Sequence, residues 1–562
     1  MRTREICRGG IPTWASRGWS GLVAALLALW IGTPQTGLAN VYATNVRLNG
    51  SAVGAALYIP CGEVQISYLL NEPATAGVTV DILDGTNVVH SIVLAGGGPG
   101  TQRGWNAVVW DAHDAQGNLV PLATYAVRIT AASHGYERWT QISDDLCPGN
   151  YVWDGVGIAV NRNTNSPYYG RVFVANASPG PNPGFNPGDR VGLLKLNADG
   201  SAPADGVHST GGWSWAGDGF SPWKLEVGPD DRLYVHDWSG GAVVQFDQWV
   251  SYQSRRVTWR SGETVPGVTN NFSGLALSGS GSEALLWLAD AAGTNDSGVW
   301  RFELDAQGAV QAGDVGTLVA QAGGDSDLDR AAYDVAVDVS NRIYVIQHRL
   351  AAFDPAARLL CFPPYTNGAA PLTNALWKVG GGNNTMRGAS GVAADPTGRY
   401  VAVAFAGVLE GSFLTGGRTI IFDATSGEVI TNILTDLPGQ GSHAHADVAW
   451  DQAGNLYDLD RSESLWRVYS PPGSNAASTV ATAPLLVSEP PLTPILQALG
   501  HANGRFLLAL TGRTNVSYVI EAAPGFAGWA PVATNGTSAC PTRVVAIDAP
   551  LSQSFYRARP LP

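Results

Sequence analysis

The chain has 562 residues, of which only 14% are charged, and its formal net charge is −13. Such an excess of acidic groups makes nucleic acid and anionic membranes poor partners. Gly, Trp, Thr and Val are abundant while long Ala/Glu/Lys/Leu stretches are missing, so the composition predicts an all-β protein, and the length requires more than one domain.

Residues 1–39 are expected to form a secretory signal peptide. Four Arg precede an apolar run at residues 21–31, which is too short to span a bilayer comfortably, and small residues surround the expected cleavage point after Ala39. Loss of this segment, with its four Arg and one Glu, would change the net charge from −13 to −16. We therefore expect a secreted protein, or one held in the periplasm or extracellular envelope, without membrane insertion.

Residues 40–135 carry the motif of a known domain. The motif residues, in order, are Trp110-Asp111, Asp114, Gly117-Asn118, Pro121 and Tyr125. This pattern resembles the immunoglobulin-like domain of the FlgD group, whose members use it as a spacer or assembly module on secreted proteins. The resemblance implies an N-terminal immunoglobulin-like sandwich.

Four cysteines follow the signal segment, namely Cys61, Cys147, Cys361 and Cys540. None has CxxC or CxH spacing, so the cysteines predict no zinc site. In an oxidising compartment Cys61 and Cys147 could form a disulfide, although four cysteines allow three connectivities.

Residues 136–482 contain a repeat, and repeats expose a fold before any single motif does. Four copies of equal length begin at Lys224, Asp334, Gly391 and Asp447, and two longer copies begin at Gly157 and Gly274. Each copy reads as an apolar strand, a polar turn and a second strand. A third strand is expected after each copy, starting at Leu193, Val243, Val299, Leu350, Thr419 and Leu465. Units that cannot bury both faces alone predict a ring of sheets, here a six-bladed β-propeller.

Ring closure usually borrows a strand from the other end of the chain, so residues 138–145 are expected to supply the outer strand of the last blade. Asp451 and Asp460 fall in the turn and strand-end columns of the repeat and are expected to be structural.

The repeat phrases, such as DVAWDQAGNLYDLD from Asp447, resemble the NHL-like and gluconolactonase-like propeller group. That group contains lactonases, lyases and many binding proteins, so the resemblance implies a fold and leaves activity open. Its lactonases hold a divalent metal with a Glu, an Asn and an Asp. Here Glu226 is the only glutamate in the first-strand columns and no Asn pairs with it, so we expect neither a metal nor another cofactor.

Residues 483–562 are expected to contain a linker and a C-terminal module. Residues 470–494 are rich in Pro, Ser and Ala, which is typical of a linker. The segments SYVIEAAPGFAGWAPVATN and SFYRARP resemble a small β-sandwich at the ends of many secreted bacterial proteins, especially in the Verrucomicrobia and Planctomycetes.

The segments just before the innermost strands should converge at one face of the propeller. They contain Trp213, Trp215, Trp223 and Lys224 before the second blade, Asp334 in the fourth, and His443, His445 and Asp447 in the sixth. The tryptophans could bind a ligand or cover a blade edge with equal ease, and two histidines without a third ligand are more often surface residues.

Two functions remain open for these residues. In the first, the protein is a secreted, monomeric binding or adhesion protein, with the tryptophans stacking on an extracellular glycan or a protein ligand. In the second, it is a propeller lyase or hydrolase acting on polysaccharide or lactone, with His443, His445, Asp334 and Asp447 around a metal or as acid and base. We prefer the first, because the sequence yields no complete catalytic set.

Overall fold

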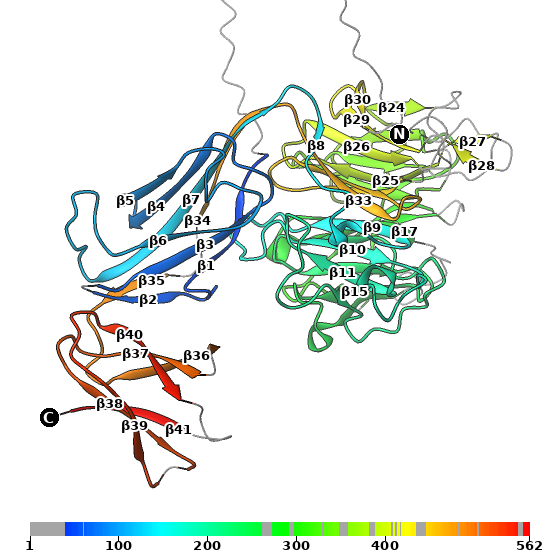
Figure 1. Cartoon of the computed structure of the whole chain (residues 1–562). Coiled ribbons are helices and arrows are strands. Elements are labelled where there is room, and N and C mark those ends of the chain that lie inside the picture. Colours follow the sequence, from blue (N-terminus) through cyan, green and yellow to red (C-terminus); the bar gives the residue numbers. More distant parts are fainter. Residues whose placement is uncertain are drawn as a thin grey trace, which may run out of the picture. The chain divides into compact units, whose positions relative to one another are not determined.

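The computed structural model of the chain (Figure 1) describes a set of ranges separated by short gaps. The described ranges are 40–59, 61–260, 272–291, 297–311, 313–328, 331–347, 358–380, 388–405, 408–410, 413–415, 417–433, 445–480, 484–502, 505–525, 527–548 and 555–561. Within these ranges the helices are the short 3-10 turns η1 (Pro148–Asn150), η2 (Pro187–Asp189), η3 (Tyr252–Ser254) and η4 (Gly281–Glu283). No helix in the described part of the chain has the length and apolarity of a membrane span.

The N-terminal strands form two facing sheets. One sheet has the order β1 (Ala43–Leu48), β3 (Val64–Leu70), β6 (Gly104–Trp110). The other has the order β2 (Ala55–Tyr58), β35 (Leu485–Ser488), β7 (Ala123–Tyr136), β4 (Gly77–Asp84), β5 (Asn87–Leu94), and β34 (Gly473–Val480) also pairs with β7. Alternate side chains such as Ile66, Trp110 and Tyr125 fill the common core. The Tyr125 hydroxyl donates a 2.6 Å hydrogen bond to the Pro121 carbonyl, which ties the start of β7 to its preceding turn.

The segment expected to be a linker is instead part of this sandwich. After the propeller, β34 pairs with β7 along most of its length, and β35 inserts between β2 and β7. The linker prediction was wrong because Gly, Asn and Ala lower the apparent strand propensity of β34, whereas its pairing with β7 decides its conformation. The propeller is therefore an insertion between two strands of one sandwich.

The cysteine pairing also differs from the one suggested by the sequence. Cys61 forms a disulfide with Cys540, 479 residues away. Cys147 and Cys361 are free thiols. Chain distance gave no guide to this pairing, because the two partners belong to strands and turns that meet only in the folded chain.

Within the described ranges, six four-stranded antiparallel sheets lie between β7 and β34 in the chain. The first three blades are β9 (Gly155–Val160), β10 (Val172–Asn176), β11 (Gly192–Leu196) and β12 (His208–Ser209); β13 (Leu225–Val227), β14 (Leu233–Asp237), β15 (Ala242–Phe246) and β16 (Arg256–Arg260); and β17 (Phe272–Ser278), β18 (Leu285–Asp290), β19 (Gly298–Glu303) and β20 (Thr317–Gln321). All of these begin with an innermost strand that the repeat predicted.

The remaining blades keep the same plan. They are β21 (Asp334–Val337), β22 (Ile343–Ile346), β23 (Arg358–Phe362) and β24 (Trp377–Gly380); β25 (Ala389–Ala394), β26 (Tyr400–Phe405), β29 (Arg418–Asp423) and β30 (Val429–Ile433); and β31 (His445–Trp450), β32 (Leu456–Asp460), β33 (Leu465–Ser470) and β8 (Thr140–Gln141). A small hairpin, β27 (Val408–Glu410) with β28 (Phe413–Thr415), lies between β26 and β29 in the chain.

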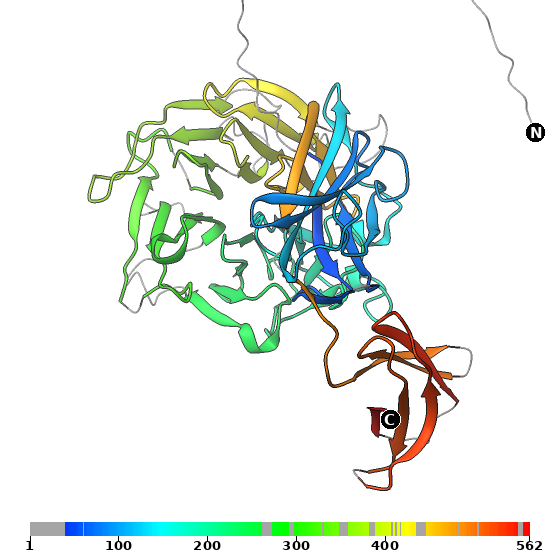
Figure 2. The same ribbon diagram turned by 90° about the vertical axis from the view of Figure 1, so that its left-hand side faces the viewer.

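The sheets close into a ring, so the all-β, six-bladed propeller fold is confirmed. The innermost strands contact one another in the cyclic order β9, β13, β17, β21, β25, β31 and back to β9. Figure 2 shows these sheets arranged around a common centre. β8 pairs with β33 through Gln141 opposite Tyr469 and Thr140 opposite Ser470, which confirms the expected closing strand.

The third strand of the fourth blade was predicted at the wrong place. The residues from Leu350 to Asp354 lie outside the described part of the chain, and the third strand of the fourth blade is β23. Its residues Leu359 to Phe362 are all buried, whereas the prediction relied on a similarity to the tags of the other blades.

The Asp column of the repeat turns is structural, as expected. Asp451 accepts hydrogen bonds from the backbone N–H and side-chain amide of Asn455, both at 2.8 Å. Asp338 accepts from the N–H of Ser340 at 2.8 Å, and Asp395 from the N–H of Tyr400 at 2.6 Å. Each carboxylate therefore closes its own turn.

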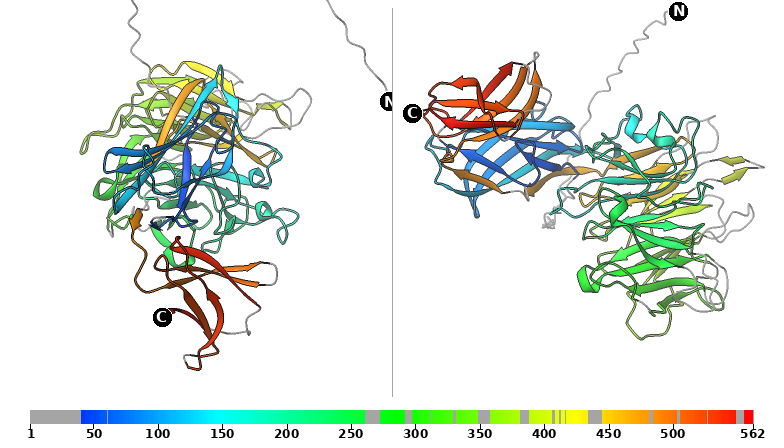
Figure 3. Two further views of the ribbon diagram at one scale, coloured as in Figure 1. Left: turned by 60° about the vertical axis from the view of Figure 1, so that its left-hand side comes forward. Right: turned by 90° about the horizontal axis from the view of Figure 1, so that it is seen from below.

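The C-terminal residues form a second, smaller pair of sheets, coloured orange to red in Figure 3. Their orders are β36 (Ile495–Ala502), β37 (Arg505–Thr511), β40 (Thr542–Asp548), and β39 (Ala530–Asn535), β38 (Tyr518–Ala523), β41 (Phe555–Pro560). Leu508, Leu510, Tyr518 and Ile520 are among the residues of their core.

Candidate functional site

Three of the predicted site residues meet inside the ring. Lys224 precedes β13, Asp334 begins β21 and Asp447 lies in β31, and their side chains converge on the central channel. The Lys224 ammonium donates to Asp447 Oδ1 at 2.6 Å and to the Ala446 carbonyl at 2.9 Å, and it lies 3.8 Å from Asp334 Oδ2. All three residues are at most 4% exposed. We call them the channel triad.

Around the channel, glycines alternate with the charged residues from blade to blade and leave space for the side chains of the channel triad. Blades one, three and five carry Gly157, Gly274 and Gly391 in the column where the other blades carry the charged residues. A Cβ on Gly274 would lie 2.2 Å from Asp334 Oδ1, and one on Gly391 would lie 2.3 Å from Asp447 Oδ1. A side chain at either glycine would therefore displace a carboxylate.

The carboxylates of the triad interact with Lys224 and also accept hydrogen bonds from backbone N–H groups of the propeller strands. Asp334 accepts hydrogen bonds from the N–H of Val335 at 2.9 Å and of Val392, in the next blade, at 3.1 Å. Asp447 accepts from the N–H of Ile158, in the first blade, at 2.9 Å. Burial raises the pKa of both carboxyls, against the opposing effect of the Lys224 ammonium. The triad therefore joins neighbouring blades, and the space left beside it is a cavity of only about 40 Å³.

The raised pKa of Asp334 predicts a pH effect on stability. The folded chain holds this proton more tightly than the unfolded chain, so the stability that it contributes is lost as the pH rises from about 4 through the raised pKa. We expect wild type to gain more stability than Asp334→Asn when the pH falls from 8 to 5, measured by thermal unfolding. Buried carboxyls outside the channel triad remain in both chains and cancel in this comparison, whereas Asp447 interacts with Asp334 and its titration changes with the substitution.

The control for this pH effect is Asp325→Asn, at an exposed position in the same blade region. It should follow the wild-type pH dependence. An Asp334→Asn chain that also follows it would show that Asp334 titrates at its ordinary pKa.

Of the predicted histidine pair, His445 is the member that the structure describes, and its ring pairs with Asp458 rather than with the channel triad. His443 lies outside the described residues, and His445 is buried with its Nδ1 2.9 Å from Asp458 Oδ1 and 2.8 Å from Asp458 Oδ2. Thr419 donates a 2.6 Å hydrogen bond to the same carboxylate. Burial by itself would lower the pKa of His445, but the Asp458 carboxylate outweighs it and the pKa is raised.

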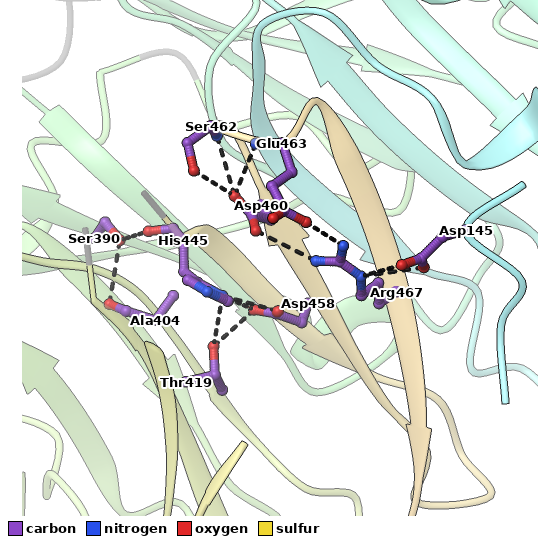
Figure 4. A network of polar contacts seen from close by, with 10 residues as sticks. All are labelled: Asp145, Ser390, Ala404, Thr419, His445, Asp458, Asp460, Ser462, Glu463 and Arg467. Atoms are coloured by element: carbon purple, nitrogen blue, oxygen red, sulfur yellow. Dashed lines mark hydrogen bonds and ion pairs between the residues drawn. The ribbon is translucent and has the colours of Figure 1, made fainter. Parts of the chain in front are cut away.

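Figure 4 shows that this pair belongs to a wider polar network between β31, β32 and β33. Asp460 accepts from the N–H groups of Ser462 and Glu463, both at 3.1 Å, and lies 3.3 Å from an Arg467 guanidinium nitrogen. The structural role expected for Asp460 is thus confirmed. Within the described ranges, no three His, Cys, Asp or Glu side chains are grouped so as to hold a metal ion.

The predicted tryptophan platform is largely packed into the blade. Trp223 is 6% exposed and belongs to the core between the first two blades. Trp213 donates a 2.8 Å hydrogen bond from its indole to Asp237, and Trp215 donates one to the Thr210 carbonyl at 3.2 Å. Both are half-buried against the same core, so the three rings cover the blade edge, the alternative that the sequence left open.

A different aromatic row lies at the end of the channel where the innermost strands begin, which we call the start face. Phe220 is 50% exposed, and its ring centroid lies 5.6 Å from that of Trp238, which lies 6.3 Å from that of Tyr333. Trp238 directly follows β14 and Tyr333 directly precedes β21. Neither residue was predicted from the sequence, although each lies beside a column of the repeat.

An ion pair lies next to this aromatic row. Arg461 donates to Asp154, and a Cβ on Gly219 would lie 3.8 Å from both the Arg461 Nη2 and an Asp154 carboxylate oxygen. Because Gly219 precedes Phe220, the exposed ring and the ion pair are neighbours. Beside Asp154, Trp153 is 42% exposed. The start face therefore has an exposed ring on the residue before Asp154 and another on the residue after Gly219, which lies next to the charged pair.

No protein-family model and no curated protein sequence matches the chain. Among solved structures, it is similar to a protein of unknown function from Bacteroides thetaiotaomicron, with 13% identity over 78% of this chain and 99% of that chain, at a TM-score of 0.35. It is also similar to virginiamycin B lyase from Staphylococcus aureus, with 9% identity over 61% and 98% of the two chains and a TM-score of 0.29. A third is the GH74 enzyme of Niastella koreensis, with 14% identity over 77% and 69% and a TM-score of 0.34. At these values the propeller assignment rests on the sheet order and the ring of inner strands.

Proposed function

We propose that the protein is a secreted binding protein whose propeller recognises an uncharged extracellular glycan at the start face. The observation that carries this proposal is the half-exposed Phe220 ring, which is backed by Trp238 and Tyr333, two half-buried rings packed against the core of the first two blades. Exposed aromatic faces stack on the C–H faces of sugar rings, and such stacking needs no ligand charge.

The neighbouring ion pair supports the same class of ligand. Asp154 and Arg461 together add no net charge, yet they present hydrogen-bond acceptors and donors beside Phe220 and Trp153. A few polar groups placed among aromatic side chains are typical of small-molecule sites. The acidic surface of the whole chain disfavours anionic ligands, which points to neutral sugars.

The enzyme alternative has less support in the residues named for it. His445 is bonded to Asp458, and Asp334 and Asp447 are bonded to Lys224 and to backbone N–H groups. These side chains are occupied by structural contacts rather than directed at one point of the start face. We therefore propose binding as the function.

The proposal predicts loss of glycan retention in Phe220→Ala. The purified protein without residues 1–39 would be screened on an array of neutral plant, fungal and bacterial glycans, and hits confirmed by calorimetry. Removing a stacked ring is expected to weaken binding by about 1–3 kcal/mol, which is about five-fold to 150-fold. The melting temperature should change little, because the ring is half exposed.

Phe185→Ala is the matched control, since Phe185 is 94% exposed and makes no ring contact among the described residues. It should bind as wild type does. Equal retention by both variants, or a glycan array without any hit, would count against the start face as the binding site.

A further inference from the structure

The opposite end of the channel holds a second opening. We call it the turn-face basin, because it is lined by the turns that join the first and second strands of all six blades. Its volume is about 610 Å³, within the range of sites for small molecules. It shares Arg162, Leu277, Val337 and Ala394 with the lining of the central cavity, so the two spaces adjoin.

The rim of the turn-face basin is polar and uncharged. Its outer residues include Thr164, Ser278, Asn341 and Gln452. Asp338 and Asp395 also line it, but their carboxylates accept hydrogen bonds from their own turns and are almost fully buried. The rim therefore presents hydroxyl and amide groups rather than charge.

A partly exposed ion pair lies where the basin adjoins the central cavity, because Arg162 lines both spaces and its partner Glu226 lines the cavity. Arg162 Nη2 donates a 3.0 Å hydrogen bond to Glu226 Oε1, and the two side chains are 33% and 24% exposed. A guanidinium has five N–H donors, and within the described residues this is the one hydrogen bond that Arg162 makes. Donors are thus left over next to a carboxylate that can accept further bonds.

This arrangement selects by charge as well as by geometry. Arg162 and Glu226 balance each other, and the two carboxylates of the channel triad lie behind them with one ammonium, which disfavours an anion. The guanidinium in front of Glu226 disfavours a cation. A pair of neighbouring hydroxyl groups fits both partners, since one hydroxyl accepts from Arg162 while the next donates to Glu226.

We propose that the turn-face basin binds a small uncharged saccharide, of the size of one or two sugar rings. The apolar lining from Val227, Leu277 and Val337 would contact the C–H faces of the rings, and the rim would bind the remaining hydroxyl groups. This site lies at the other end of the channel from the aromatic row, so it does not rest on glycan binding at the start face.

The test measures saturation-transfer NMR signals from glucose, galactose, mannose, maltose and cellobiose with the protein, and includes glucuronate and glycine as charged comparators. At least one neutral sugar should show saturation. Arg162→Lys keeps the charge opposite Glu226 but removes the forked donors, so it should weaken that sugar about ten-fold. Thr164→Trp adds bulk to an exposed rim position and should abolish the signal even where Arg162→Lys does not fold.

Two controls locate the site. Asn165→Ala, at an exposed residue beyond the basin lining, should leave binding unchanged. Phe220→Ala should also leave it unchanged, which separates this site from the start face. The proposal is overturned if none of the neutral sugars shows saturation, if glucuronate or glycine alone does, or if folded Arg162→Lys and Thr164→Trp bind as wild type does.

Discussion

Lys224→Met is expected to lower the free energy of unfolding of the propeller by about 3–5 kcal/mol. Lys224 is 2% exposed, and its ammonium lies 2.6 Å from one carboxylate and 3.8 Å from another. Without it, Asp334 and Asp447 would remain buried in one channel with no opposing charge. The two carboxylates would then either repel each other or take up protons, and both outcomes cost stability because each has lost the partner that offset its desolvation.

The measurement is chemical or thermal unfolding followed by tryptophan fluorescence, since the blades hold most of the tryptophans. Lys378→Met serves as the matched control, because the Lys378 side chain is 49% exposed and its pair with Asp327 lies at the surface. Exposed pairs contribute about 1 kcal/mol or less. Equal losses in the two variants would mean that the channel triad adds no more to stability than a surface pair.

A second substitution tests the cause of this loss. In Lys224→Met with Asp447→Asn, a single carboxylate remains, so the double variant should be more stable than Lys224→Met alone. Both variants share any change in methylene packing at position 224, so packing alone would not make the double variant the more stable of the two. If the double variant is the less stable of the two, the repulsion between Asp334 and Asp447 is not the reason for the loss.

The repeat made most of the propeller predictable. Strand, turn and second strand lie within about fifteen residues, so local periodicity and turn chemistry carry the information. The Asp451 turn and the innermost strands of all six blades follow from that pattern. Closure by β8 was predictable as well, because a ring of repeats leaves one strand to be supplied from the other end of the chain.

The site was less predictable, because it depends on contacts between blades. The column of Gly157, Lys224, Gly274, Asp334, Gly391 and Asp447 was visible in the sequence, but the alternation became meaningful only when neighbouring blades placed each carboxylate against a glycine. His445 is a further example. Counting back from the turn would place it opposite Arg461, and a bulge between His445 and Asp447 shifts it to Asp460. Its ring contacts Asp458 instead, so this pair could not be inferred from the turn position.

Trp223 shows a different limit. A Gly-rich loop with several tryptophans can cover a core or face solvent, and the composition is the same in both cases. Phe220, three residues earlier, is the half-exposed ring, while Trp223 is buried between blades. Which ring faces outward depends on the path of the loop over β14 and β15, and that path is set by contacts such as the Trp213 hydrogen bond to Asp237.

Leu485→Ala is expected to destabilise the sandwich by about 2–5 kcal/mol, whereas Leu486→Ala should change its stability by about 0.5 kcal/mol or less. The two leucines are adjacent in β35, yet Leu485 is fully buried in the sandwich core and Leu486 is 46% exposed. Alternation of this kind follows from the two faces of a strand. A linker would make the two substitutions equivalent.

The effect of Leu485→Ala should be local in its origin. β35 joins β2 to β7, so a cavity beneath Leu485 weakens the pairing on both sides of the strand. Hydrogen exchange should therefore rise first in β2 and in the part of β7 near Tyr125, while the innermost propeller strands keep wild-type protection. Equal stability and equal exchange in the two variants would show that residues 485–488 do not complete the sandwich.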